Sequence, residues 1–262
     1  MKVLKSSFEG EIVKHYDQFF LPSEKVYREC QYLLQMLKQY RPGFGLLMDV
    51  GCGTGAYSEE MSKYFKRVLG VDVSDDMISY AENNHSTVNT RYICSDIRSF
   101  DEIDNGCIDV AISLAHVIGY QLDNKSVNRY LRTVHNKLKD DGLFLFNFYN
   151  MPAIYSSPLN ARHVKRKNEH AEITRISNAT NNKEKGCLDL DYYYIIENHS
   201  NTEIDDTSVV EIHEQMRYFT KCEIELFLNK NGFTAESFFN YGTDIDLTSD
   251  EWNAGCLARK LT

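Results

Sequence analysis

A glycine-rich turn between a strand and a helix constrains this chain more than any other feature. Leu46–Val50 is a mostly apolar run that ends at glycines, which predicts a buried strand, and residues 56–65 after it predict a helix. Between them stand Gly51, Gly53 and Gly55 in the spacing GxGxG. Glycines have no Cβ, so the backbone can turn sharply there and approach a ligand closely. We therefore expect a ligand at the carboxyl end of this strand.

Strands and helices alternate on either side of the turn. Expected strands are 46–50, 67–73, 91–94, 108–114 and 143–148, and expected helices are 24–40, 56–65, 74–83, 124–139 and 221–231. This alternation is typical of a parallel sheet with helices on both faces. Residues 233–241 and 255–260 are expected to add an antiparallel pair. The predicted fold class is thus α/β: a doubly wound, mostly parallel, Rossmann-like sheet of seven strands.

The pattern changes after Tyr149. Period-two alternation over residues 171–179, 187–198 and 209–218 predicts antiparallel strands, with a hairpin loop at 181–186. We expect residues 150–218 to be a β-rich insertion over the active site. Residues 1–149 and 219–262 would then form the main, ligand-binding domain, with residues 1–40 as an N-terminal helical lid.

Composition limits the partners of the chain. The 262 residues carry 38 acidic and 29 basic side chains, a net charge of -9, which argues against a nucleic-acid partner. The one basic run, at residues 162–167, is interpreted as a solvated loop. No apolar run is long enough to cross a bilayer, so no membrane partner is expected, and the N-terminus lacks the apolar core of a signal peptide. The partner expected is a small-molecule substrate, and a homodimer remains open.

Cysteine and histidine spacing gives two further expectations. The seven cysteines are scattered without a CxxC pair, which is typical of reduced thiols in a cytoplasmic protein. The eight histidines show no HxH or HxxxH spacing, so no metal site is predicted.

Three features of the turn favour S-adenosylmethionine (SAM) over a dinucleotide. The spacing is GxGxG, whereas the pyrophosphate-binding turn of NAD-dependent oxidoreductases needs GxGxxG. Asp49 would repel a pyrophosphate but tolerates a zwitterionic methionine with its sulfonium. Asp72 ends the second strand, where an acid accepts hydrogen bonds from two ribose hydroxyls. Asp96 ends the third strand and is a candidate acceptor for the adenine amino group. A tight connection or a helix cap would explain each feature singly.

The same residues carry a family resemblance. Residues 47–55 and 69–74 resemble motif I and the following acid of class I SAM-dependent methyltransferases, over about residues 40 to 150. The resemblance implies SAM as cofactor and S-adenosylhomocysteine as product, with Asp72 on the ribose, Asp96 on the adenine and Met77 over its face. For Met77, a core methionine is the alternative. The full predicted set of cofactor contacts is Asp49, Gly51, Cys52, Gly53, Gly55, Asp72, Val73, Met77, Asp96, Ile97 and Leu114.

The wider layout is similar to sugar N,N-dimethyltransferases of nucleotide-linked aminosugar biosynthesis. The shared features are Tyr16-Asp17, residues 114–120 after the fourth strand, and the insertion with a late His213. The candidate catalytic residues are His116, Tyr16, Tyr120 and His213, with Asn147 and Tyr149 also on the substrate side. His116 is the best candidate for a base, because a neutral imidazole takes a proton near pH 7. A packed histidine at a strand end is the alternative.

The predicted function is methyl transfer to a small polar metabolite, with an amine nitrogen ahead of oxygen. An amine needs only to be deprotonated, whereas a hydroxyl needs a stronger base or a metal. Residues 147–150 lack both prolines of the Asn/Asp-Pro-Pro-Tyr/Phe pattern of enzymes that methylate nucleobases and glutamine. Two alternatives stay open: a small-molecule O-methyltransferase, and a catalytically silent SAM-binding partner protein. Tyr192, Tyr193 and Tyr194 lie on one expected strand, so alternate members face opposite ways, and sheet packing is their expected role.

Overall fold

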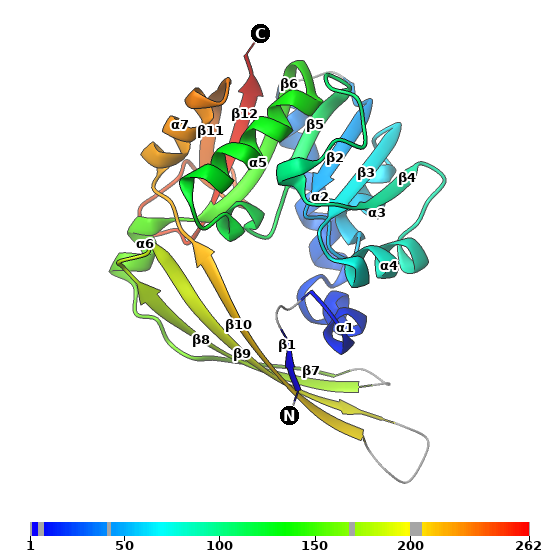
Figure 1. Cartoon of the computed structure of the whole chain (residues 1–262), viewed down its shortest axis with the longest axis vertical. Helices are drawn as coiled ribbons and strands as arrows, with labels where there is room; N and C mark the ends of the chain where they lie inside the picture. The colour runs from blue at the N-terminus through cyan, green and yellow to red at the C-terminus, as the bar shows by residue number, and fades with distance from the viewer. Residues whose placement is uncertain (1, 5–7, 41–42, 168–170, 200–205, 262) are drawn as a thin grey trace.

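The chain folds into a seven-stranded sheet flanked by helices and a second, five-stranded sheet that lies across the carboxyl ends of its parallel strands (Figure 1). The computed structural model describes residues 2–4, 8–40, 43–167, 171–199 and 206–261. Among the helices in these ranges, none is both long and apolar enough to span a membrane.

The main sheet has the predicted topology. Its strands are β2 (Leu46–Val50), β3 (Arg67–Asp72), β4 (Thr90–Cys94), β5 (Ile108–Ser113), β6 (Leu138–Tyr149), β11 (Phe233–Asn240) and β12 (Asn253–Lys260), in the order β11-β12-β6-β5-β2-β3-β4. Only β12 runs against its neighbours β6 and β11. The prediction of seven mostly parallel strands is therefore confirmed. The strand order reverses between β2 and β5, which is where doubly wound sheets bind ligands.

Alternating side chains of the main sheet fill two apolar layers. Met48 and Val50 of β2 face α5 (Asn124–Lys137) and α7 (Lys221–Lys230), whereas Leu47 faces α2 (Ser23–Tyr40) and α3 (Ala56–Ser62). The remaining helical segments are α1 (Glu11–Phe20), α4 (Asp75–Asn84), α6 (Met151–Ser156) and the short turns η1 (Ile97–Ser99) and η2 (Val117–Tyr120). Ser74 caps α4 as expected, because its hydroxyl accepts the Met77 N–H at 3.1 Å.

The insertion forms most of the second sheet. Its strands are β1 (Lys2–Leu4), β7 (Arg162–Lys167), β8 (Ala171–Asn182), β9 (Cys187–Asn198) and β10 (Asp206–Arg217), in the order β1-β10-β9-β8-β7. The three predicted strands are present, and all pairings are antiparallel except that of β1 with β10.

Two parts of this sheet differ from the expectation. The basic run predicted to be a loop is the edge strand β7, whose Lys165 forms an ion pair with Glu172 of β8. The N-terminal forty residues were expected to be helical, yet residues 2–4 form β1. Three residues are too few to show a period, and β1 is a strand only because β10 supplies its partner.

Helix α1 lies against the inner face of the second sheet. Ile12 and Phe19 of α1 pack with Ile173, Ile196 and Val210. Helix α2, by contrast, packs on α3 and the main sheet. Of the predicted lid at residues 1–40, α1 and the preceding Phe8 and Glu9 border the space between the sheets, whereas α2 is part of the main domain.

Candidate active site

A cavity of about 800 Å³ lies between the carboxyl edge of the main sheet and the inner face of the second sheet. This volume falls within the roughly 300–1,000 Å³ of small-molecule sites. The wall formed by the main sheet includes Val50, Gly51, Gly53, Asp72, Val73, Asp96 and Ile97; the opposite wall includes Arg175, Tyr192, Tyr194 and Glu214; and α1 and η2 contribute Tyr16, Phe20 and Tyr120.

The three glycines of the turn have different neighbours. Gly51 and Gly53 have φ of 74° and 54°, a left-handed conformation that suits glycine. A Cβ on Gly51 would lie 2.5 Å from Val117 Cγ2, so packing excludes one there. A Cβ on Gly53 would meet no atom within 4 Å. The main chain at Gly53 is therefore open to a ligand in the cavity.

Asp72 at the end of β3 is fixed by the main chain around it. Its carboxylate accepts the N–H groups of Gly53 and Ser74, both at 2.9 Å. Burial raises the pKa of Asp72, and these hydrogen bonds oppose the rise. A carboxylate has about four acceptor positions, and the main-chain N–H groups of Ser74, Gly53 and Val73 leave at least one of them for a hydroxyl group in the cavity.

The second predicted acid, Asp96, also lines the cavity but already has a partner. Arg98 binds its carboxylate through Nε at 2.9 Å and Nη2 at 2.6 Å. The Arg98 guanidinium holds the pKa of Asp96 below its usual value. An adenine amino group in the predicted contact would have to share the Asp96 carboxylate with Arg98. Val73 and Ile97 line the cavity as predicted.

Asp49 and Cys52 support the turn from beneath, outside the cavity wall. Asp49 accepts the Ser58 hydroxyl at 2.7 Å, and burial raises its pKa to about 7. Cys52 packs against Ile78 and Tyr92. The prediction that both contact the cofactor needs correction, because their side chains point into the packed layers.

Three further predicted contacts are also absent from the wall. Met77 and Leu114 are 0% and 4% exposed, so both are core residues, as the alternative for Met77 held. A Cβ on Gly55 would lie 2.7 Å from Tyr92 Oη, so this glycine serves close packing. The local sequence did not reveal the orientation of Met77 and Leu114, because their neighbours Asp76 and Ala115 do line the cavity.

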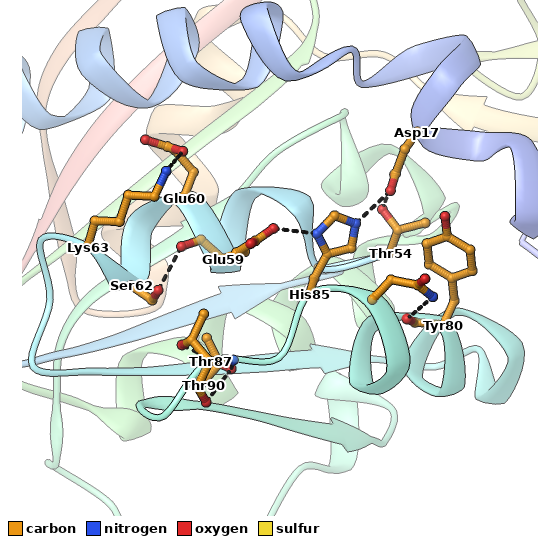
Figure 2. A network of polar contacts seen from close by, with 12 residues as sticks. Asp17, Thr54, Glu59, Glu60, Ser62, Lys63, Tyr80, His85, Thr87 and Thr90 are labelled. Atoms are coloured by element: carbon orange, nitrogen blue, oxygen red, sulfur yellow. Dashed lines mark hydrogen bonds and ion pairs between the residues drawn. The ribbon is translucent and has the colours of Figure 1, made fainter. Parts of the chain in front are cut away.

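A cluster of three side chains joins α1 to the turn (Figure 2). His85 Nε2 lies 2.7 Å from Asp17 of α1, and its Nδ1 lies 2.6 Å from Glu59 of α3. Asp17 also accepts the Thr54 hydroxyl, which belongs to the turn. The hydrogen bond with Asp17, followed by that with Glu59, raises the pKa of His85. We call Asp17, His85 and Glu59 the His85 cluster; it holds α1 over the cavity.

Tyr16 and Tyr120 stand between the two walls. Tyr16 packs against Phe20 with ring centroids 4.7 Å apart. Burial raises its pKa, and the charges of Glu214 and Asp72 on opposite walls raise it further. Tyr120 donates to Glu214 Oε2 at 3.0 Å, and burial together with that carboxylate raises its pKa well above 10. Both phenols therefore stay protonated, and Tyr120 acts as a hydrogen-bond donor.

His116 lies behind the wall. Ala115 and Val117 on either side line the cavity, but the His116 ring stacks on Tyr149 with centroids 4.0 Å apart. The main-chain N–H of His116 donates to Asn147 Oδ1 at 2.9 Å. Burial lowers the pKa of His116 to about 4. The prediction of a base is therefore corrected to the packed alternative, and Asn147 and Tyr149 are its supports.

His213 belongs to the outer face of the second sheet. Its ring binds Asp191 at 2.6 Å and Glu211 at 3.4 Å, and the hydrogen bond with Asp191 raises its pKa. Its side chain is 58% exposed, and it borders the cavity only at the rim. Adjacent strand residues face opposite ways, so the inward side chain is that of Glu214. The catalytic assignment of His213 is corrected for that reason.

The sequence did not single out Arg175 and Glu214 of the wall, and it gave Tyr192 and Tyr194 only a role in sheet packing. Alternation correctly separated Tyr193 from Tyr192 and Tyr194, since Tyr193 lies on the outer face beside Glu211. The alternation did not indicate which face of the strand lines the cavity. Sheet packing is therefore only part of the role of the tyrosine run.

Residues 47–142 match a family model described as a methyltransferase domain. The matched segment contains the glycine-rich turn, Asp72 and Asp96. The chain therefore contains a SAM-dependent methyltransferase domain.

Relatives and solved structures agree with this family. The methyltransferase is 26% identical to an uncharacterized protein of Methanocaldococcus jannaschii over 242 residues, 89% of this chain and 80% of that one. It is 29% identical to a malonyl-[acyl-carrier protein] O-methyltransferase of Bacillus cereus over 151 residues, 56% of this chain and about half (52%) of the relative. The sugar N-methyltransferase KedS8 from Streptoalloteichus has the same fold, with a TM-score of 0.78 at 18% identity, over 100% of this chain and 99% of that one.

The cavity fits the cofactor of a SAM-dependent methyltransferase. The open main chain at Gly53 and the remaining acceptor capacity of the Asp72 carboxylate suit a ligand that carries hydroxyl groups. Gly51, Gly53, Asp72, Val73 and Ile97 are the predicted contacts that would hold SAM there.

Removing the Asp72 carboxylate is expected to weaken SAM binding. The variant Asp72→Ala loses two hydrogen bonds to a charged acceptor, which together contribute about 2–4 kcal/mol. Calorimetry with SAM measures this change. Asp104→Ala, in a surface turn, is the control and keeps its affinity. Unchanged affinity in a folded Asp72→Ala protein would remove Asp72 from the site.

The His85 cluster is expected to make stability depend on pH. The pKa of His85 is raised in the folded protein. The contribution of the cluster to the free energy of unfolding is therefore fully present below about pH 6.5, the pKa of His85 in the unfolded chain, and is lost as the pH rises through the folded pKa. Charged and titratable groups facing His85 are Asp17, Glu59 and, at a ring distance of 6.1 Å, Tyr80. The variant His85→Gln should lose about 1 kcal/mol at pH 6 and progressively less at higher pH.

Thermal unfolding at several pH values checks this expectation. His163→Gln, on the exposed edge strand β7, is the control and should follow the wild type throughout. A difference between wild type and His85→Gln that is constant from pH 6 to pH 9 would contradict the titration of the cluster.

Proposed function

We propose that this methyltransferase transfers the methyl group of SAM to the amine nitrogen of a small polar metabolite that resembles an aminosugar. The observation that carries the proposal is Glu214, which lines the cavity and accepts the Tyr120 hydroxyl at 3.0 Å. Tyr16 and Tyr192 also interact electrostatically with this carboxylate. A carboxylate among aromatic rings attracts an ammonium group, since it offers charge while the rings offer their negative faces.

The strength of the available bases favours nitrogen over oxygen. Tyr16 and Tyr120 hold their protons, and His116 lies behind the wall with a pKa of about 4. A hydroxyl acceptor needs a strong base, whereas an ammonium group loses its proton to a carboxylate or to water. Glu214 is the group best situated to take that proton.

The residues of the chain contribute alignment and exclusion of water. SAM supplies a methyl group on a positively charged sulfur, open to in-line displacement. Tyr120 donates a hydrogen bond to Glu214, Tyr16 lines the cavity with its phenol protonated, and Glu214 orients the amine. Helix α1, held by the His85 cluster, covers the cavity, so solvent is kept from the reacting groups.

The relatives support two acceptor classes. KedS8 is described as a sugar N-methyltransferase and has the same two-sheet fold, which favours the aminosugar class. The Bacillus cereus relative is described as an O-methyltransferase, and this keeps a small-molecule hydroxyl or carboxyl as the second candidate acceptor. A SAM-binding protein without turnover is the remaining alternative.

Methyl-labelled SAM separates these candidates. The purified protein is incubated with matched pairs such as glucosamine and glucose, and the position of the label is read by mass spectrometry and NMR. We expect label on nitrogen of the amine compounds. Label only on oxygen would select the second candidate, and SAM binding without transfer to any acceptor in the panel would contradict the enzyme proposal.

Glu214 itself provides a sharper test. Glu214→Gln should lower kcat/KM for an amine substrate at least tenfold, because the neutral amide neither attracts the ammonium nor accepts its proton. SAM affinity should stay within about twofold, since Glu214 lies on the wall opposite Asp72. The matched control is Glu211→Gln, a carboxylate of the same strand on the outer face. Equal losses in both variants would assign Glu214 a structural role.

A further inference from the structure

Arg175 is a basic residue on the wall that the second sheet forms, and aromatic rings surround it. Among the lining residues of that sheet, the other basic residue is His213 at the rim. It lies on β8 in the row Arg175–Tyr194–Val210 across the inner face. Its guanidinium carbon is 4.7 Å from the centre of the Phe20 ring, 5.3 Å from that of Phe19 and 5.8 Å from that of Tyr192. Aromatic rings of α1 and β9 therefore surround this cation.

Arg175 forms no ion pair within the described part of the chain. Its Nε is buried and has no hydrogen-bond partner among the described residues. By contrast, Arg98 Nη2 lies 2.6 Å from Asp96 Oδ2, and Arg217 Nη2 lies 3.7 Å from Glu223 Oε1. A buried donor without a partner has lost its hydrogen bonds to water, so its position beside a cavity calls for a partner that enters the cavity.

The contacts of Arg175 leave its most specific surface available. Aromatic rings pack against the faces of a guanidinium, and its five N–H groups lie in the plane and point outward from the edge. That edge matches two oxygens of a carboxylate or phosphate in a bidentate contact. The rings of Phe19, Phe20 and Tyr192 exclude water and thereby strengthen such a contact.

Arg175 and Glu214 face the same cavity at some distance from each other. Arg175 shares a row with Val210, and Glu214 lies four residues farther along β10, two strands away from β8. Strand geometry puts their Cα atoms about 17 Å apart. Tyr192 lies between them, and its phenol interacts with the negative charge of Glu214 and the positive charge of Arg175.

We propose that Arg175 forms a subsite for an anionic oxygen group, carboxylate or phosphate, on the same metabolite whose amine meets Glu214. The substrate is then an amine whose anionic group is several bonds from the nitrogen. This inference rests on the proposed function for the amine end only, since the anion subsite stands on the surroundings of Arg175.

Binding of sugars without an amine tests the subsite apart from methyl transfer. Calorimetry on the protein loaded with S-adenosylhomocysteine compares glucose with glucose 6-phosphate and with glucuronate. We expect at least one of the two anionic sugars to bind with an affinity at least tenfold higher than that of glucose. Tighter binding of glucose 6-phosphate would identify the anion as phosphate, and tighter binding of glucuronate would identify it as carboxylate. Equal binding of all three sugars would overturn the proposal.

Variants assign the effect to Arg175. Arg175→Gln should abolish the preference for the anionic sugar, and Arg175→Lys, which keeps the charge but loses the bidentate edge, should retain part of it. The matched control is Arg166→Gln on the exposed strand β7, which should keep the full preference. Unchanged melting temperature and SAM affinity in the Arg175 variants show that the fold is intact. A preference that survives in Arg175→Gln would contradict the subsite.

The two proposals fail separately. If no amine is methylated but glucose 6-phosphate or glucuronate binds through Arg175, the proposed function is wrong and the subsite stands. If glucosamine is methylated and Arg175→Gln lowers kcat/KM for glucosamine and glucosamine 6-phosphate by the same factor, the proposed function stands and Arg175 has only a structural role.

Discussion

The double attachment of helix α1 is the constraint on which the site depends. Its apolar face, with Ile12 and Phe19, packs on the second sheet, and its polar face reaches the glycine-rich turn through Asp17, Thr54 and His85. One helix thus joins the two sheets around the cavity (Figure 1). Burial of the apolar face provides most of the stability of this arrangement, and the charged contacts determine its position. Without α1, Tyr16 and Phe20 would be absent from the site and the rings around Arg175 would be incomplete.

The cavity separates opposite kinds of chemistry on its two walls. The wall of the main sheet offers main chain and the carboxylate of Asp72, which suit hydroxyls and a cationic cofactor. The wall of the second sheet offers Glu214 and Arg175 among tyrosines. Charges surrounded by rings are screened less than charges in water, so each acts strongly on a ligand that enters. Under the proposed function, the first wall holds the methyl donor and the second determines the acceptor.

Strain is concentrated where η2 meets the cavity. Ala115 and His116 have φ of 56° and 63°, a conformation that costs about 1–3 kcal/mol per non-glycine residue. The Asn147 and Asn253 amides, which are 2.9 Å apart, and the stacked Tyr149 ring hold this segment in place. The result is that Ala115, Val117 and Tyr120 face the cavity while the His116 ring is turned away. The histidine that looked most catalytic in the sequence therefore supports the wall.

The sequence by itself determined the strand–helix alternation, the turn at Gly51–Gly53–Gly55 and the role of Asp72 as the acid at the end of β3. Each depends on local periodicity or on the backbone freedom of glycine, which neighbouring residues encode. Only the tertiary structure decided that β7 is an edge strand and that α1 borders the cavity while α2 does not. It also decided that Arg175 and Glu214 point into the cavity, whereas the His116 ring packs behind the wall and His213 lies on the outer face. Those outcomes depend on contacts between segments far apart in the chain. A period-two pattern separates the two faces of a strand, but the packing of one sheet across another determines which face becomes the wall of the site.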